Sequence, residues 1–236
     1  MKIRPLPLLV SAFALGAALF MGCRSEPPVP MGWYVATETV DLSAFLREPP
    51  TNSSPTTRAE LDAMLALQQA RTPEDLQRIR GDGPVGLRMF AGALGPNVRP
   101  EQLPATAALL SFAMDNAQAV INDAKARWQR PRPWALESRL SPCIDKPSSP
   151  SYPSDRATQS RLCATLLGAL VTSRQAALLT RADQVAQDRV LAGVHFPSDV
   201  QAGKELGQFL AERMLLSPAS QADLATARAE LAKQVP

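Results

Sequence analysis

Residues 104–128 read PATAALLSFAMDNAQAVINDAKARW and carry the clearest helical pattern of the chain. Their apolar side chains recur at spacings of three and four: Leu109, Leu110, Phe112, Ala113, Ala117, Val120 and Ile121. This spacing predicts a long α-helix with one buried face. Pro131 and Pro133 follow and are expected to end the helix, because proline cannot continue the backbone hydrogen-bond ladder.

From Thr57 onward the rest of the chain is also helical in pattern. Thr57 can cap a helix that runs through Leu61 and Leu67, and Thr72-Pro73-Glu74 is a cap followed by proline at the first helical position. No alternating run predicts a strand, so the fold class is expected to be all-α. Further helices are expected at about 154–171, 173–191, 197–215 and 220–233.

The composition agrees with a helical protein of one domain. The chain has 236 residues, of which 45% are hydrophobic but only 5% aromatic. Such a balance, rich in Ala and Leu, favours helices over a β-sandwich. The formal net charge is +3 and the basic residues are not gathered on one strip, so nucleic acid is not an expected partner.

The first 22 residues have the pattern of an export signal. Lys2 and Arg4 precede an apolar run, residues 8–20, which ends shortly before Gly22-Cys23. The Gly-Cys pair resembles a bacterial lipobox, in which Cys23 would become the lipidated first residue and attach the protein to a membrane. A plain cleaved signal peptide and an uncleaved anchor are the alternatives. All three predict export, to the periplasm or as an envelope-anchored bacterial lipoprotein.

Residues 23–55 are rich in Pro, Ser and Thr and are interpreted as a tether and N-terminal extension. Within it, Trp33-Tyr34 and residues 40–46 carry the apolar side chains that could dock on the domain. The helical domain is therefore expected to span residues 56–236.

Two cysteines remain if Cys23 carries lipid. Export would permit a Cys143–Cys163 disulfide, which would tie the loop before Tyr152 to the helix after it. Two separate thiols are the alternative, because sequence spacing does not give the distance between them.

Three short segments marked by proline carry the side chains that suggest chemistry. They contain three cations, one hydroxyl, the only histidine of the chain and one carboxylate: Lys125, Arg132, Ser154, Arg189, His195 and Asp199. Cations can hold a phosphoryl group, a histidine can attack it, and a carboxylate can orient that histidine. Together the three segments predict a phosphoryl-transfer pocket.

The order of the last segment explains how His195 would be oriented. Pro197 suits the first turn of a helix, which places Asp199 in that turn. Side chains on a helix lean toward its N-terminus, so Asp199 can reach back to His195. A carboxylate on one ring nitrogen fixes the tautomer and leaves the other nitrogen free to attack.

At these residues the chain resembles the class A bacterial nonspecific acid phosphatases, in the superfamily of type-2 phosphatidic acid phosphatases and vanadium haloperoxidases. The family pattern is K-x6-R-P, then P-S-G-H, then S-R-x5-H-x3-D. Lys125 to Pro133 match the first element, and Arg189, His195 and Asp199 match the third at the right spacing. The similarity runs from about Asp41 to the C-terminus.

The resemblance implies a fold and a set of roles. The fold would be a single helical-bundle domain of the acid phosphatase and haloperoxidase type, needing no metal or other cofactor. His195 would be the nucleophile and Asp199 its orienting partner. Four side chains would hold the phosphate: Lys125, Arg132, Ser154 and Arg189. The substrate would be a phosphomonoester, hydrolysed at acid pH outside the cytoplasm.

The middle element departs from the family pattern. Where the family has Gly-His after Pro-Ser, this chain has Asp155-Arg156. The family histidine protonates the leaving oxygen, and a guanidinium cannot release a proton at working pH. Asp188 also replaces a serine, which we interpret as a surface change.

Two functions are consistent with this departure. The first is an exported acid phosphatase that uses a phosphohistidine intermediate with reduced or altered activity; Arg156 would be a further anion clamp and Asp155 could act as the acid. The second is a degenerate envelope lipoprotein that binds phosphate-like anions or a protein partner without turnover. The missing histidine also disfavours a vanadate-dependent haloperoxidase.

Overall fold

The computed structural model describes residues 33–37 and 40–235. Over these residues the chain forms α-helices and short 3₁₀ helices and no strand, which confirms the all-α prediction. The α-helices are α1 (Leu42–Phe45), α2 (Pro55–Ala70), α3 (Pro73–Gly81), α4 (Leu87–Leu94), α5 (Pro104–Trp128), α6 (Pro133–Leu136), α7 (Asp155–Leu170), α8 (Gln175–Leu191), α9 (Pro197–Leu216) and α10 (Gln221–Leu231). The 3₁₀ helices are η2 (Pro100–Gln102), η3 (Thr172–Arg174) and η4 (Pro218–Ser220).

The long helix predicted from the sequence is α5, with the bounds expected. It ends at Trp128 and is capped by Gln129, whose φ of 46° is left-handed and whose N–H donates to the Lys125 carbonyl. Pro131 and Pro133 then prevent any continuation. The prediction for α2 was wrong at its start: Ser54, not Thr57, is the cap, because its hydroxyl accepts from the Thr57 N–H at 3.1 Å.

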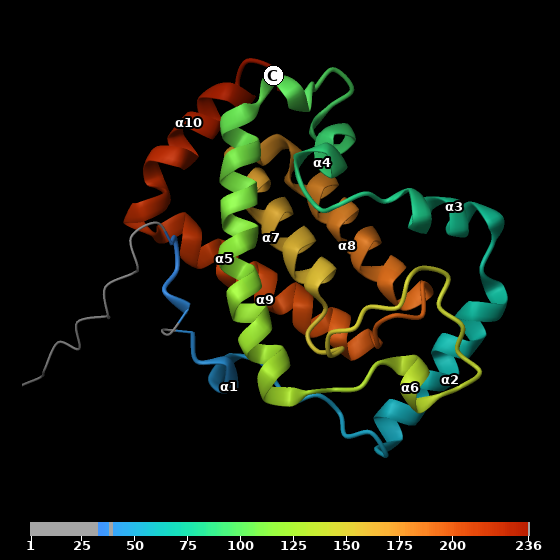
Figure 1. Cartoon of the computed structure of the whole chain (residues 1–236). Coiled ribbons are helices and arrows are strands. Elements are labelled where there is room, and N and C mark those ends of the chain that lie inside the picture. The colour runs from blue at the N-terminus through green and yellow to red at the C-terminus, as the bar shows by residue number, and fades with distance from the viewer. Residues whose placement is uncertain (1–32, 38–39, 236) are drawn as a thin grey trace, which may run out of the picture.

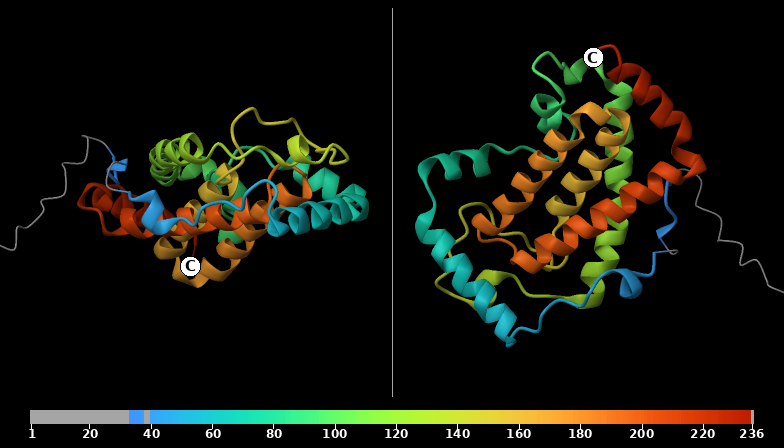
Figure 2. Two further views of the ribbon diagram at one scale, coloured as in Figure 1. Left: turned by 90° about the horizontal axis from the view of Figure 1, so that it is seen from below. Right: turned by 180° about the vertical axis from the view of Figure 1, so that it is seen from behind.

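The helices pack around α7, which lies in the middle of the bundle (Figures 1 and 2). Its most extensive contacts are with α9 and α8, and α5 crosses it on another side. Two glycines allow α9 to approach closely. A Cβ on Gly203 would lie 2.7 Å from the Ser154 carbonyl oxygen, and one on Gly207 would collide with the Thr158 carbonyl. The start of α7 and the first half of α9 are therefore held against each other by backbone contact.

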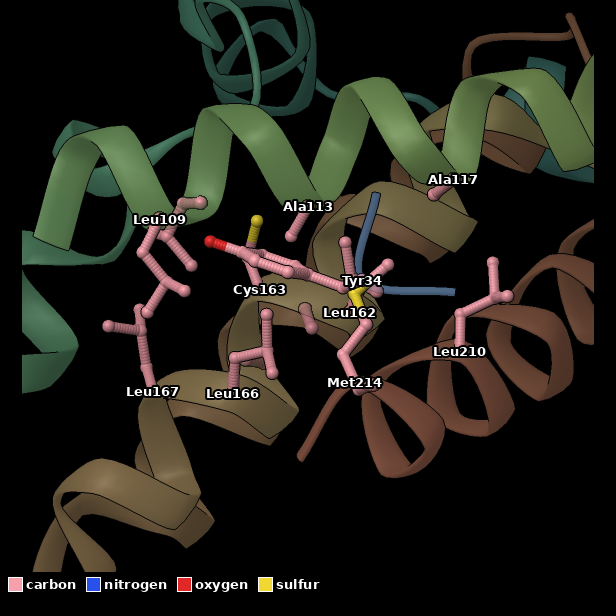
Figure 3. Packing of buried hydrophobic residues seen from close by; sticks show 14 of the residues in the cluster. Tyr34, Leu109, Ala113, Ala117, Leu162, Cys163, Leu166, Leu167, Leu210 and Met214 are labelled. Atoms are coloured by element: carbon pink, nitrogen blue, oxygen red, sulfur yellow. The ribbon is translucent and has the colours of Figure 1, made fainter. Parts of the chain in front are cut away.

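The main core fills the space between α5, α7, α9 and α10. Figure 3 shows side chains of α5 and α7 meeting Leu210 and Met214 of α9 around the ring of Tyr34. Leu162, Cys163 and Leu210 are completely buried there. Burial of this apolar surface is the largest stabilising contribution and sets the relative positions of the helix ends.

The segment before α2 docks on the helices. Tyr34 is buried and donates a 2.6 Å hydrogen bond to Asp223, and Val35 exchanges two 2.9 Å bonds with Asn116. Leu42 and Leu46 are also buried, so the docking expected for Tyr34 and residues 40–46 is confirmed. The predicted signal, the Cys23 lipidation site and the first part of the tether lie outside the described residues.

The disulfide that the sequence left open is not formed. Cys143 and Cys163 are both free cysteines. Cys163 is completely buried on α7 in the main core, whereas Cys143 packs beside Ile79 and Val194 in a separate apolar cluster. Each sulfur is thus held by different packing partners. Among the described helices, none is both long enough and apolar enough to cross a membrane.

Candidate active site

The three segments singled out in the sequence meet at one end of the bundle. The loop between α6 and α7 and the turn between α8 and α9 lie together there (Figure 1). The backbone joins them directly, because the Ser154 N–H donates to the Asp199 carbonyl at 3.0 Å and the Cys143 N–H donates to the Ala192 carbonyl at 3.1 Å. Lys125 reaches the same place from the last turn of α5.

His195 lies in the turn before α9 and is only 4% exposed. Its Nδ1 is 3.5 Å from Oδ2 of Asp199, in the first turn of α9, as the sequence predicted. The same Oδ2 accepts the Phe196 N–H at 2.9 Å and so caps the helix. Because the carboxylate faces Nδ1, the proton is favoured on that nitrogen and the lone pair on Nε2.

Asp199 is held by two residues that the sequence reasoning missed. Arg130 donates Nη1 to Oδ1 at 2.5 Å, and the hydroxyl of Ser151 donates to Oδ2 at 2.5 Å. Asp199 is completely buried. Burial raises the pKa of its carboxyl, but contact with His195 and Arg130 outweighs burial, and the pKa lies below the ordinary value. Asp199 therefore stays ionised beside the imidazole.

Arg130 in turn connects the site to α2. Its Nη2 donates to Glu60 at 3.2 Å, its Nη1 donates to the Ser198 hydroxyl at 2.7 Å, and its guanidinium lies 3.9 Å from the centre of the Phe196 ring. Glu60 also accepts the Ser198 N–H at 2.7 Å. The first turn of α9 is thus fixed from three sides. The only sequence signal for this was an arginine directly before Pro131, in Gln129-Arg130-Pro131-Arg132-Pro133.

Arg132 lies across the other side of the imidazole. Its Nη1 is 2.9 Å from Nε2 of His195 and donates to the Val194 carbonyl at 2.8 Å. Its Nε and Nη2 donate to the backbone oxygen and hydroxyl of Ser149, at 2.8 and 3.1 Å. Burial lowers the pKa of Arg132, and Asp155 and Asp199 oppose that shift. The guanidinium therefore contacts the ring nitrogen that carries the lone pair.

Lys125 is buried and bonded to three acceptors. Its Nζ donates to the carbonyls of Pro150 and Pro153 at 2.6 and 2.9 Å, and lies 3.0 Å from Oδ2 of Asp155. Burial lowers the pKa of Lys125, and the Asp155 carboxylate counteracts this most strongly. The lysine predicted to hold phosphate is in the site, but an internal carboxylate is already bound to it.

Ser154 and Arg189 each leave buried polar atoms without a partner, as Arg130 does at its Nε alone. The Ser154 hydroxyl is completely buried and bonds to no described residue. Ser154 precedes α7 in the N-cap position, yet its side chain makes no capping bond. Arg189, in the last turn of α8, is 5% exposed, and its Nε and Nη2 also find no partner within the described chain. Unpaired buried donors are costly and mark places where a ligand would fit.

Two charged side chains, Asp155 and Arg156, lie at the start of α7. Asp155 turns toward α5, where Lys125 and Gln118 contact its two oxygens at 3.0 and 3.3 Å. Arg156 turns the other way and donates to the Gly83 carbonyl at 2.7 Å, in the loop between α3 and α4. Burial lowers the pKa of Arg189 to about 10, and the Arg156 charge adds to that shift. Arg156 is thus on the Arg189 side of the site and Asp155 on the Lys125 side.

The interpretation of Asp188 as a surface change is wrong. Asp188 is 1% exposed and accepts two hydrogen bonds from Nε of Arg78, at 3.1 and 3.3 Å, and one from Nη2 at 2.8 Å. A buried carboxylate needs such a partner, and Arg78 supplies it from α3. This ion pair fixes α3 beside Arg189.

These observations define a buried imidazole between a carboxylate and a guanidinium, with further cations around it, in an all-α bundle. Comparison with known proteins agrees with this class. Residues 105–219 match the model of the PAP2 superfamily. The chain is 27% identical to a non-specific acid phosphatase of Salmonella typhi over 96% of this chain and 90% of that protein.

The chain is also similar to a second phosphatase and to a solved structure of the same fold. The chain is 32% identical to a decaprenylphosphoryl-5-phosphoribose phosphatase of Mycobacterium tuberculosis over 64% of this chain and 85% of that one. A bacterial vanadium-dependent iodoperoxidase superposes with a TM-score of 0.58 at 17% identity, covering 71% of this chain and 52% of that chain, and is similar in fold. This protein belongs to the PAP2 superfamily, with homologues named non-specific acid phosphatase.

Proposed function

We propose that this protein is an exported acid phosphatase that hydrolyses phosphomonoesters through a phosphohistidine intermediate. The observation that carries the proposal is the buried imidazole of His195, which faces Asp199 through Nδ1 and Arg132 through Nε2. The unpartnered donors of Arg189 and Ser154 support it, since a phosphoryl group offers the oxygens that these donors lack. The phosphatase homologues support the same class of reaction.

In the proposed reaction Nε2 of His195 attacks phosphorus and the ester P–O bond breaks, so the leaving oxygen carries away the bonding electrons. Asp199 stabilises the imidazolium that forms, and it is itself held by Arg130 and Ser151. Arg130, Ser151 and Glu60 are thus positioning residues. Water then attacks the phosphohistidine, which releases inorganic phosphate and restores the imidazole.

Arg132 has a specific task in this sequence. In the structure its Nη1 is in hydrogen-bond contact with Nε2 of His195, the nitrogen that attacks. The guanidinium must therefore turn toward the phosphoryl oxygens before attack. Lys125, Arg132, Ser154 and Arg189 would then surround those oxygens, and their donors stabilise the charge that accumulates in the transition state. Each cation is buried, so its interaction with the anion is weakened less by water than on the surface.

The replacement of the family histidine by Arg156 predicts a changed leaving-group preference. Loss of a general acid typically lowers a rate by about 10²–10⁴-fold. The loss affects alkyl esters most, because a phenolate departs without a proton whereas an alkoxide needs one. Arg156 donates to Gly83 and lines a cleft with Asp115 and Gln159, so a leaving group there would meet a guanidinium that cannot release a proton to it.

The proposal is tested by hydrolysis of p-nitrophenyl phosphate at mildly acid pH. We expect turnover by the wild-type protein and none by His195→Ala. Asp123→Asn is the control, because Asp123 is exposed on α5 and its replacement leaves the site residues in place. No turnover by folded wild-type protein at any pH would overturn the proposal.

A second candidate is a degenerate envelope lipoprotein that binds phosphate-like anions or a protein partner without turnover. The observation that favours it is the Asp155 carboxylate bound to Lys125, since this pair occupies a cation of the anion site. It predicts phosphate or vanadate binding by wild-type protein with no product from any ester. Lipid on Cys23 is tested separately by incorporation of labelled fatty acid, which Cys23→Ser should prevent.

A further inference from the structure

We propose that Asp155 is an internal competitor for the phosphate site, and that its carboxylate must leave Lys125 before a phosphate oxygen can bind there. This inference rests on the proposed phosphate site but makes no assumption about turnover. It concerns the residue that stands where the family pattern has glycine, for which the sequence suggested a role as the acid.

Every N–H donor of Lys125 is already bonded within the protein. An ammonium group has three N–H donors and no acceptor. The three acceptors around Nζ are the carbonyl oxygens of Pro150 and Pro153, at 2.6 and 2.9 Å, and Oδ2 of Asp155, at 3.0 Å. Every donor therefore has a partner before any ligand arrives. A phosphate oxygen can bind Nζ only by replacing one of them.

Of the three acceptors around Nζ of Lys125, the Asp155 carboxylate is the one that a phosphate oxygen can replace. The two carbonyls belong to the backbone that leads into Ser154, and that backbone is tied to α9 by the bond from the Ser154 N–H to the Asp199 carbonyl. Asp155 is bound through a side chain that is 27% exposed, and its other oxygen has only a 3.3 Å contact with Gln118. Rotation of this side chain exposes the carboxylate to water, whereas moving the carbonyls would disturb the site itself.

The negative charge of Asp155 also competes with phosphate for the nearby cations. The Asp155 carboxylate acts on both cations at this side of the site, because it counteracts the effect of burial on the pKa of Lys125 and of Arg132. A bound phosphate would need the same two cations. Two anions at one pair of cations repel each other, so phosphate and the inward-facing carboxylate exclude one another.

The consequence is a weaker affinity for small anions than the cation set alone would give. A substrate must supply enough binding energy, from its own contacts, to displace Asp155. The Asp155–Lys125 contact therefore raises selectivity against free inorganic phosphate, which has only its oxygens with which to bind the protein.

The test uses Asp155→Gly and Asp155→Asn in the full chain. Titration calorimetry with inorganic phosphate should give a Kd lowered by about tenfold or more in both variants, since like-charge contact at close range costs at least the equivalent of one decade in affinity. Asp155→Asn keeps the size and shape of the side chain, so it guards against failure of the glycine variant to fold. Asp123→Asn removes an exposed carboxylate from the same helix as Lys125 and should leave the Kd unchanged.

The outcomes separate this inference from the proposed function. If wild-type protein hydrolyses p-nitrophenyl phosphate but both Asp155 variants bind phosphate no better than Asp123→Asn, the inference is overturned and the phosphatase remains. If both Asp155 variants bind phosphate more tightly and no protein turns over, the inference is supported and the phosphatase proposal fails. If none of the four proteins binds phosphate at millimolar concentration, the inference is overturned.

Discussion

The two arginines that flank the site, Arg130 and Arg189, are buried to a similar degree but differ in their partners. Arg130 is bonded to Asp199, Glu60 and Ser198, and it packs on a ring. Its Nε alone has no partner in the described chain, whereas Arg189 leaves both Nε and Nη2 unpaired. The comparison distinguishes a guanidinium that organises the protein from one that is available to a ligand.

The difference extends to the residues around each arginine. On the Arg130 side, Ser151 and the Phe196 N–H complete the contacts of the Asp199 carboxylate. On the Arg189 side, the Ser154 hydroxyl is also without a partner, and Arg156 adds a second positive charge. The polar contacts on the Arg130 side therefore orient His195. On the Arg189 side most of the buried donors near the site have no partner, and an anion could bind them.

The largest effect is expected from replacing each arginine by methionine. Arg130→Met leaves the completely buried Asp199 charge without its closest cation, and breaking such a pair costs about 3–5 kcal/mol of folding free energy. Arg189→Met removes unpaired donors, so the free energy of unfolding should change by less than about 1 kcal/mol. Denaturant unfolding measures both values.

Steady-state kinetics should also distinguish Arg130 from Arg189. Arg130→Met should lower kcat for p-nitrophenyl phosphate with little change in KM, because it acts through Asp199 and His195. Arg189→Met should raise KM and abolish phosphate binding while the protein stays folded. Equal loss of stability in the two variants would show that Arg189 has a structural role and would end the distinction.

The next effect concerns Arg156. Arg156→His supplies a group that can release a proton at the leaving oxygen, so hydrolysis of an alkyl phosphate should rise by up to about 10²-fold. Hydrolysis of p-nitrophenyl phosphate should rise much less, because its phenolate leaves unaided. The ratio of kcat/KM for the two esters is the measurement. An unchanged ratio would point to Asp155, or to the shape of the loop, as the obstacle.

The smallest effect is a shift in pH dependence. Burial lowers the pKa of His195, and the Arg132 charge lowers it further, while Asp199 acts in the opposite direction. Neutral imidazole is the nucleophile, so activity should persist as pH falls below the ordinary histidine pKa and decline only when pH falls through the lowered value. The acid limb of kcat in Arg132→Gln should lie at higher pH than in wild-type protein. A limb that stays in place or moves to lower pH would contradict this account of His195.

Much of the fold could be predicted because its signals are local. The bounds of α5 followed from its apolar spacing and from the prolines beyond it, and Thr72-Pro73 marked the start of α3 through a capping bond. His195 and Asp199 could be paired because they lie four residues apart at a helix start. Each of these inferences needs only neighbours in sequence.

The parts that could not be predicted depend on contacts between distant segments. Arg130 reaches Glu60 across 70 positions, and Arg78 reaches Asp188 across 110. The close approach at Gly203 depends on how α7 crosses α9, which no local pattern gives. The pairing of Lys125 with Asp155 is of the same kind, since it joins α5 to the start of α7.

We propose above all that His195 is a nucleophile, held in position by Asp199 and by the cations around it. Brief reaction with a ³²P-labelled phosphomonoester, followed by alkaline denaturation, tests it most directly, because phosphohistidine survives alkali and is lost in acid. The account predicts alkali-stable, acid-labile label on wild-type protein and on Asp123→Asn, and none on His195→Ala. Label that persists on His195→Ala, or product formation by wild-type protein without any labelled enzyme, would contradict it.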